Sequence, residues 1–303
     1  MSIAGLMAKD EMGQPNVRLQ RILVATDFSS GAREALDCAL NIGRAFHTKI
    51  FLVHVIPTAA FRYVSPDSSE EAARQARAFA IQEMKKLVQE AGCEGEVREE
   101  VLFSGVVWPV LQEFAKVNEI DLIVLGTHDR SPGKSRLLGP VTEEIFRVAD
   151  RPILTVAPPN RESGKQTGKI QRILYATNFK PHAERAAVCA YAMERELQAR
   201  LTVLHVVEDP ATAPHAGHKM VEEFLVQRMK KSIPAVCAGK CEPTFHVRFG
   251  DPAQEILRLA SEEQSDLIVL GMRSGKSGNG LLPSAVAYEL ACQSPCPVLT
   301  IRH

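Results

Sequence analysis

The sequence has no excess of charge of either sign. Lys and Arg together number 36, Asp and Glu also number 36, and the isoelectric point is near 7.1. A nucleic-acid-binding domain usually carries a cluster of basic residues on one face. The balanced charge therefore gives no electrostatic reason to expect a nucleic-acid partner.

Long hydrophobic runs are also missing. The apolar runs are short, about four to eight residues, whereas a membrane-spanning helix needs about 20. The first residues include Lys9, Asp10 and Glu11, which a signal peptide would not place in its apolar core. We therefore expect a protein without membrane insertion and with a cytoplasmic location.

The cysteines do not form a recognisable framework. There are seven, an odd number, and the pairs Cys237/Cys241 and Cys292/Cys296 do not have the two-residue spacing of a zinc knuckle. Both pairs lie in the second half of the sequence, and the first half has no counterpart of either pair. Reduced thiols and no metal site are the expectation.

What the sequence does contain is an internal duplication. The run from Asp121 to Gly126 recurs letter for letter from Asp266 to Gly271, and His54-Val55 recurs as His205-Val206. Equivalent residues are 151 apart in the first part of the unit and 145 apart in the rest. Solenoid repeats are about 20–50 residues long. This repeat is therefore a whole domain present twice.

Each copy alternates strands with helices. In the first copy, short apolar runs predict strands, and apolar residues near helical spacing predict helices. The expected strands are 21–26, 50–56, 97–102, 121–125 and 153–156, and the expected helices are 30–46, 67–91, 106–117 and 142–149. The second copy repeats this order between residues 172 and 301. Such alternation predicts a parallel sheet, and right-handed crossovers then favour an α/β doubly wound arrangement with helices on both faces.

The domain boundaries follow from the repeat. We expect a flexible tail over residues 1–18, a first domain over 19–157, a second over 169–303, and a linker rich in Pro and Gly over 158–168. The two domains have an ordinary size for independently packed units.

The carboxyl ends of the strands are the expected ligand site in a doubly wound sheet. In the first copy they bring together Asp27, His54-Val55 and the loop that starts at Gly126. This loop carries Arg130, Lys134 and Arg136 and leads into a helix, which is a favourable environment for phosphate. A solvated loop without a ligand is the alternative.

These features resemble the universal stress protein family. The resemblance rests on the strand ending in Ala-Thr-Asp27, the strand Leu-Val-His54-Val55 and the loop Leu-Gly126-Thr-His, and it covers both copies. It implies two tandem Rossmann-like domains, each with a five-stranded parallel sheet. It also implies dimerisation, with one branch of the family binding ATP and another not.

The resemblance also implies a nucleotide site, which neither copy retains intact. The family's loop has Gly, two residues, Gly, nine residues, then Gly and Ser or Thr. The first copy keeps Gly126 and Gly139 but has Asp129 at the second glycine and Pro140 at the hydroxyl position. A carboxylate there would repel phosphate, and proline has neither hydroxyl nor N–H.

The second copy departs further. It keeps Gly271 but has Asn178 in place of Asp27, Ser284 at the late glycine and Ala285 at the hydroxyl position. The first copy is therefore the favoured ATP site, with Mg²⁺ if ATP binds. The residues carried over from the family are Ala25, Asp27, Val55, Leu125, Gly126, Arg130, Lys134, Gly139 and Val141 in the first copy, and Asn178, Val206, Gly271, Lys276, Ser284 and Val286 in the second.

Two other repeated residue types are interpreted as structural. Asp121 and Asp266 start their strands and so lie about 16 Å from the ligand edge, where we expect them to act as turn or cap residues. His54 and His205 lie in buried strands without a nearby repeated nucleophile. Structure is favoured over catalysis for both.

Two functional hypotheses remain, with a weaker third. The first is a nucleotide-binding module whose ATP occupancy changes its contacts with other proteins. The second is a non-enzymatic stress scaffold with degenerate or repurposed pockets, and the third is slow ATP hydrolysis. Because single-domain relatives dimerise, we expect an intramolecular pseudo-dimer with strands 153–156 and 298–301 near the interface, with a homodimer as a further alternative.

Overall fold

The computed structural model describes residues 7–9, 15–17, 19–58, 66–127, 138–157, 169–208, 218–233, 242–272 and 285–302. The chain forms two compact units. One contains residues 19–149 and 155–167, and the other contains residues 1–18, 150–154 and 168–303.

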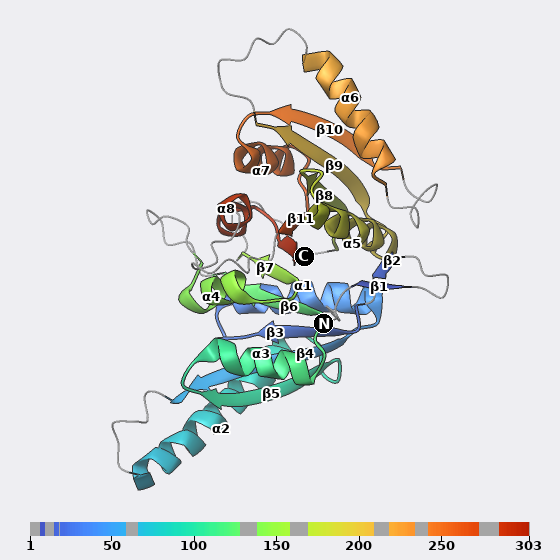
Figure 1. Ribbon diagram of the computed structural model, residues 1–303. Coiled ribbons are helices and arrows are strands. Elements are labelled where there is room, and N and C mark those ends of the chain that lie inside the picture. The colour runs from blue at the N-terminus through green and yellow to red at the C-terminus, as the bar shows by residue number, and fades with distance from the viewer. Residues whose placement is uncertain are drawn as a thin grey trace. The chain divides into compact units, whose positions relative to one another are not determined.

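The first copy forms the expected alternation of strands and helices (Figure 1). Its elements are β3 (Arg21–Ala25), α1 (Ser30–Phe46), β4 (Lys49–Pro57), α2 (Pro66–Glu90), β5 (Val97–Ser104), α3 (Val107–Val117), β6 (Leu122–Gly126), α4 (Pro140–Val148) and β7 (Ile153–Val156). The bounds of α1 and β7 are those that the sequence predicts.

The second copy repeats this order. Its elements are β8 (Arg172–Thr177), α5 (Pro181–Leu197), β9 (Arg200–Val207), α6 (His218–Lys231), β10 (Thr244–Phe249), α7 (Pro252–Glu262), β11 (Leu267–Met272), α8 (Ala285–Gln293) and β12 (Val298–Arg302). Helix α6 is 14 residues long, whereas the equivalent α2 has 25.

Both copies have the same doubly wound strand order. In the second copy the order is β10-β9-β8-β11-β12, and the neighbouring pairs are parallel. In the first copy β5, β4, β3 and β6 are parallel neighbours in that order. Strand β7 follows β6, where the Thr127 amide donates to the Val156 carbonyl at 2.8 Å. The predicted α/β Rossmann-like fold is confirmed.

Helices cover both faces of the first copy's sheet because successive strand residues point to opposite sides. On one face, the Cβ that Gly43 of α1 lacks would lie 2.7 Å from Ile50 Cδ1, so helix and strand pack closely there. On the other face, Phe51 packs edge to face with Phe114 of α3, with ring centroids 5.7 Å apart. The central strand β3 has no exposure at Ile22, Leu23 or Val24.

The start of helix α1 is determined by a side-chain cap. Ser29 is the N-cap, and its hydroxyl accepts a hydrogen bond from the Ala32 amide at 3.2 Å. The helix ends at Phe46, and the C-cap residue His47 has a left-handed conformation with φ of 53°.

The amino-terminal segment differs from the expected tail. Strands β1 (Met7–Lys9) and β2 (Pro15–Val17) form a small antiparallel sheet in the same unit as the second copy, and β2 lies against α5. Val17 is buried, with 8% exposure. This segment therefore packs against the second copy, which the composition of the sequence did not indicate.

The last strand of the first copy is divided between the units. Ile153 and Leu154 belong to the unit of the second copy, where the Thr300 hydroxyl of β12 donates to the Ile153 carbonyl at 3.2 Å.

None of the described helices is long and apolar enough to cross a membrane.

Candidate functional site

The carboxyl end of the first strand in each copy forms the same tight turn. The Phe28 amide donates to the Thr26 hydroxyl at 3.0 Å, and the Ser29 amide donates to Asp27 Oδ1 at 3.0 Å. Phe28 has a φ of 65°, and Phe179, its counterpart in the second copy, has a φ of 56°. A positive φ is uncommon for a bulky residue, and it recurs only where surrounding contacts hold it.

The second copy reproduces the hydrogen bonds of this turn. The Phe179 amide donates to the Thr177 hydroxyl at 3.2 Å, and the Lys180 amide donates to Asn178 Oδ1 at 3.1 Å. The turn therefore forms with either aspartate (Asp27) or asparagine (Asn178), because it needs only a side-chain oxygen as hydrogen-bond acceptor. The carboxylate of Asp27 is not a requirement of the fold.

The repeated histidines brace this turn. His54 Nδ1 lies 2.8 Å from the Thr26 carbonyl, and His205 Nδ1 lies 2.8 Å from the Thr177 carbonyl. The ring nitrogen must donate, because a carbonyl can only accept. Each ring also packs on the phenylalanine of the turn, with centroids 4.4 Å apart for His54 and Phe28. The structural interpretation of these histidines is supported by these contacts.

The environment of His205 favours the neutral ring. Burial lowers the pKa of His205, and the nearby Arg228 guanidinium lowers this pKa further. The hydrogen bond to the Thr177 carbonyl acts in the opposite direction. A neutral ring that donates through Nδ1 suits a bracing role.

Gly126 and Gly271 lie in close contact with a helix. A Cβ on Gly126 would be 2.4 Å from the Gly31 carbonyl carbon, and a Cβ on Gly271 would be 2.2 Å from the His182 carbonyl oxygen. Both contacts involve backbone atoms, so no side chain can give way. Packing between strand and helix is sufficient to explain this repeated glycine, which sequence reasoning connected with phosphate.

The two copies differ beside this glycine. Gly31 of the first copy corresponds to His182 of the second. His182 is buried, with 7% exposure, and its Nε2 lies 3.2 Å from Asn178 Nδ2. Both polar atoms of the Asn178 amide are therefore engaged within the second copy.

Asp27 has a different environment. Its side chain is exposed, and within the described part of the chain it accepts one hydrogen bond, through Oδ1 from Ser29. Gly31 places no side chain beside it. Sequence reasoning missed this contrast, although the exchange of Gly31 for His182 was visible in the aligned copies.

A second contrast involves helices α2 and α6. The triplet Met-Lys-Lys occurs at 84–86 and at 229–231, so Arg228 occupies the position of Glu83. The Arg228 guanidinium carbon lies 4.1 Å from the centre of the Phe179 ring, which is cation–π distance. The turn of the second copy is thus covered by a cation, whereas among the described residues of the first copy no cation lies over the Phe28 ring.

The other described candidate residues of the first copy lie around the same edge. Ala25 is the register partner of Leu125, and Val55 is buried on β4. Gly139 is the N-cap of α4, and Val141 in its first turn is 39% exposed. Arg130 and Lys134 lie outside the described residues.

The hydroxyl of Thr142 contributes to packing at this edge. It donates to the Gly126 carbonyl at 3.1 Å. Helix α4 begins at Pro140, two residues before the predicted start at residue 142, because proline suits a first helical turn, where its missing N–H is not needed. The first turn therefore offers one amide fewer to an anion.

In the second copy the equivalent edge is less completely described. Val206 and Val286 are half-buried, on β9 and in the first turn of α8 respectively. Lys276 and Ser284 lie outside the described residues.

Asp121 and Asp266 lie at the opposite edge, as predicted. Asp121 Oδ2 accepts the amides of Gln20 and Arg21 at 2.7 and 2.9 Å. Asp266 Oδ2 accepts the amides of Gln171 and Arg172, both at 3.0 Å. Each carboxylate satisfies the backbone where the first strand of its copy begins. The prediction that they are cap residues is confirmed.

The described cysteines are all free thiols. Cys38 and Cys189 are buried on equivalent helices, and burial raises the pKa of Cys189 to about 12. Among the described residues, no group of three His, Cys, Asp or Glu side chains could hold a metal ion. Cys237 and Cys241 lie outside the described residues.

Comparison with known proteins connects this geometry with one family. The model of the universal stress protein family matches residues 18–157 and again residues 169–302. Universal stress protein MJ0531 of Methanocaldococcus jannaschii is 29% identical over 147 residues, which cover 47% of this chain and 85% of that protein. A universal stress protein of Thermus aquaticus is 31% identical over 135 residues, covering 43% of this chain and 97% of that protein.

A solved structure extends the likeness in fold to both copies. The universal stress protein from Archaeoglobus fulgidus has a TM-score of 0.67 and 21% identity, and it covers 94% of this chain and 99% of that protein. The match of the family model to both halves shows that this chain belongs to the universal stress protein family, as a tandem two-domain member.

Proposed function

We propose that the protein is a non-enzymatic stress-response module that binds an adenine nucleotide, ATP with Mg²⁺, in its first domain. The observation that carries this proposal is the contrast between Asp27 and Asn178. The Asp27 carboxylate keeps one oxygen without a hydrogen bond among the described residues, whereas both polar atoms of Asn178 are engaged.

The chemistry of the first domain suits the nucleoside part of such a ligand. An exposed carboxylate at a strand end accepts hydrogen bonds from hydroxyl or amino groups. The apolar side chains of Ala25, Val55 and Val141 lie on the strands and helix that form this edge. Nucleotide sites in doubly wound sheets lie at such an edge.

The phosphate part has weaker support. Pro140 removes one amide from the first turn of α4, and the packing contact of Gly126 accounts for that glycine without a phosphate. These two facts favour the alternative, a stress scaffold whose pocket no longer takes ATP. Slow hydrolysis is the weakest alternative, because no nucleophile paired with a base is found among the described residues at this edge.

We further propose that the two domains pair within one chain as a pseudo-dimer, with a homodimer as the alternative. The support is the tandem occurrence of two domains of one family in this chain. A cytoplasmic location is proposed from the free thiols of the described cysteines. Sedimentation velocity distinguishes one chain of 33.3 kDa from a dimer of chains.

The proposal is tested first on freshly purified protein. Denaturation followed by mass spectrometry identifies any released small molecule, and calorimetry with Mg-ATP measures binding to protein from which that molecule has been removed. About one adenine nucleotide per chain supports the proposal. No released nucleotide together with no heat of binding supports the scaffold.

A further inference from the structure

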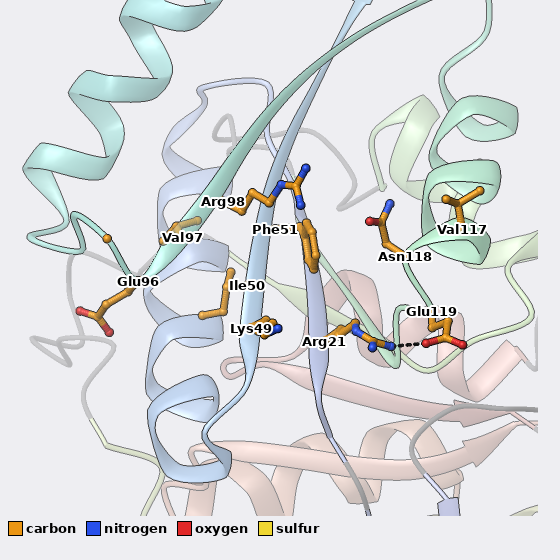
Figure 2. A pocket seen from close by; sticks show the side chains of 11 residues that line it. Arg21, Lys49, Ile50, Phe51, Glu96, Val97, Arg98, Val117, Asn118 and Glu119 are labelled. Carbon is orange, nitrogen blue, oxygen red and sulfur yellow. Dashed lines mark hydrogen bonds and ion pairs between the residues drawn. The ribbon is translucent and has the colours of Figure 1, made fainter.

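A pocket of about 490 Å³ lies in the first domain at the edge opposite Asp27. Figure 2 shows its lining side chains around the start of β4 and the end of α3. Helix α3 ends at Val117, and Phe51 packs against Phe114 one turn earlier. The pocket therefore lies where the helix stops covering this face of the sheet. Its volume is within the range of sites for small molecules.

The strand register places the lining side chains in two rows. Arg21 of β3 pairs with Lys49 of β4 in the first row. Phe51 of β4 pairs with Arg98 of β5 in the second row, and the Arg98 guanidinium carbon lies 5.7 Å from the Phe51 ring centre. Residues 49 and 51 point to the same face because strand side chains alternate. Cations therefore lie beside an aromatic surface.

The acidic residues of the pocket already have partners. Glu119 pairs with Arg21, with Nη1 and Oε2 2.6 Å apart. Glu96 accepts two hydrogen bonds from Arg44, each at 2.8 Å. The Arg44 guanidinium, through these hydrogen bonds, lowers the pKa of Glu96. Both carboxylates are thus neutralised by arginines.

Two cations keep hydrogen-bonding capacity. Among the described residues, no carboxylate lies within ion-pair distance of the Lys49 ammonium group. Arg98 uses Nε toward Glu100 at 2.7 Å, and its terminal NH₂ groups make no further bond within the described chain. In Figure 2, Arg98 lies over one end of Phe51 and Lys49 lies toward the other. An anion between them would gain charge-assisted hydrogen bonds.

The apolar part of the pocket includes an exposed valine. Val117 is 69% exposed at the end of α3. Asn118 donates through Nδ2 to the Phe114 carbonyl at 3.0 Å, which satisfies one of the last carbonyls of the helix. An apolar ligand group that packs against Val117 and the Phe51 ring would be removed from water. The hydrogen bond from Asn118 to the Phe114 carbonyl would stay intact.

The second domain provides an internal control. Thr202 and Thr244 are register partners where the first domain pairs Phe51 and Arg98. Glu262 ends α7 at the position of Val117, and it accepts hydrogen bonds from Arg248 at 2.7 Å and Arg258 at 3.0 Å. The fold therefore does not require the aromatic ring or the exposed valine at this edge.

We infer that this edge of the first domain binds a small organic anion. Its carboxylate or phosphate group lies between Lys49 and Arg98, and its flat apolar part lies against Phe51 and Val117. The site is separate from the proposed nucleotide site, because β3 and β4 span the sheet between them. Its existence does not depend on whether the first domain binds ATP.

The test uses phenyl phosphate as the probe, in titrations followed by ligand-observed NMR on the full chain. We expect saturable binding to wild-type protein, with weaker binding of inorganic phosphate and of benzyl alcohol. Lys49→Gln and Arg98→Thr should each weaken phenyl phosphate binding about tenfold, the effect of losing one hydrogen bond to a charged group. Both side chains are exposed, and thermal unfolding checks that each variant is folded.

Two matched variants locate the site. Arg200→Gln changes the second-domain counterpart of Lys49, and Asp27→Ala changes the proposed nucleotide site. Both should bind phenyl phosphate as the wild type does. The inference is overturned by absence of saturable binding, by unchanged affinity in Lys49→Gln, or by an equal loss in Arg200→Gln. A loss confined to Asp27→Ala would also overturn it, by placing the anion at the opposite edge.

Discussion

His182 lies against Asn178 in the second domain, with its Nε2 atom 3.2 Å from the amide nitrogen. The equivalent pair in the first domain is Gly31 and Asp27, between which no side-chain contact exists because glycine has no side chain. One duplicated turn has therefore acquired two different environments.

Nucleotide binding should depend on Asp27 far more than on Asn178. If the Asp27 carboxylate accepts a hydrogen bond from the ligand, Asp27→Ala should weaken Mg-ATP binding about tenfold or more, since such a bond contributes about 1.5–3 kcal/mol. Asn178→Ala is the matched control and should leave the affinity unchanged. Isothermal titration calorimetry measures both. Equal losses in the two variants would contradict the ranking of the domains.

Gly126→Ala should destabilise the protein whether or not a nucleotide is present. The new Cβ would lie 2.4 Å from backbone of Gly31, and such overpacking costs about 1–3 kcal/mol. Urea unfolding without ligand measures the change. A fully stable Gly126→Ala variant that fails to bind Mg-ATP would instead assign this glycine to the phosphates.

Asp121→Asn and Asp266→Asn should destabilise their own domains by similar amounts. In each carboxylate, Oδ2 accepts hydrogen bonds from two backbone amides at the start of a central strand. Replacing the charged acceptor with a neutral one should cost about 1–2 kcal/mol. Thermal unfolding followed by calorimetry measures both variants. Loss of ligand binding without loss of stability would show that these residues lie at a functional edge.

The second domain should lose stability at mildly acidic pH through His205. Burial lowers the pKa of His205 in the folded state, so the unfolded state binds a proton more readily. The stabilisation is present above the unfolded pKa of about 6.5 and is lost as the pH falls through that value toward the folded pKa.

This pH effect can be separated from other groups by substitution. His205→Asn removes the titrating ring while leaving an amide that can donate to the Thr177 carbonyl. Urea unfolding at about pH 7.5 and about pH 5.5 should show a smaller pH-dependent loss in the variant than in the wild type. The same loss in both proteins would assign the effect to other residues.

Much of the fold was predictable because it depends on local patterns. Helix α1 runs from Ser30 to Phe46, as its apolar spacing predicts, and β7 also has its predicted bounds. Asp121 and Asp266 were placed at the correct edge by strand length alone. The strands β1 and β2 were not predicted, because their short segments lack a periodic pattern and depend on packing against α5.

The candidate site was predictable only in outline. The sequence located Asp27 and Gly126 at the carboxyl ends of their strands, because strand direction follows from the order of elements. It did not indicate that Gly126 contacts Gly31, that His182 contacts Asn178, or that Arg228 covers Phe179. These contacts join a strand end to a neighbouring turn or helix, and no local pattern encodes them.

The sequence by itself determined the duplication, the fold class and the family, because hydrophobic periodicity and repeated motifs persist without knowledge of contacts. The tertiary structure decided what each repeated residue does. It made Gly126 and Gly271 packing residues and His54 and His205 braces, and it left Asp27 with an oxygen available to a ligand. The physical reason is that the role of a repeated residue depends on which atoms the folded sheet brings within contact distance of it.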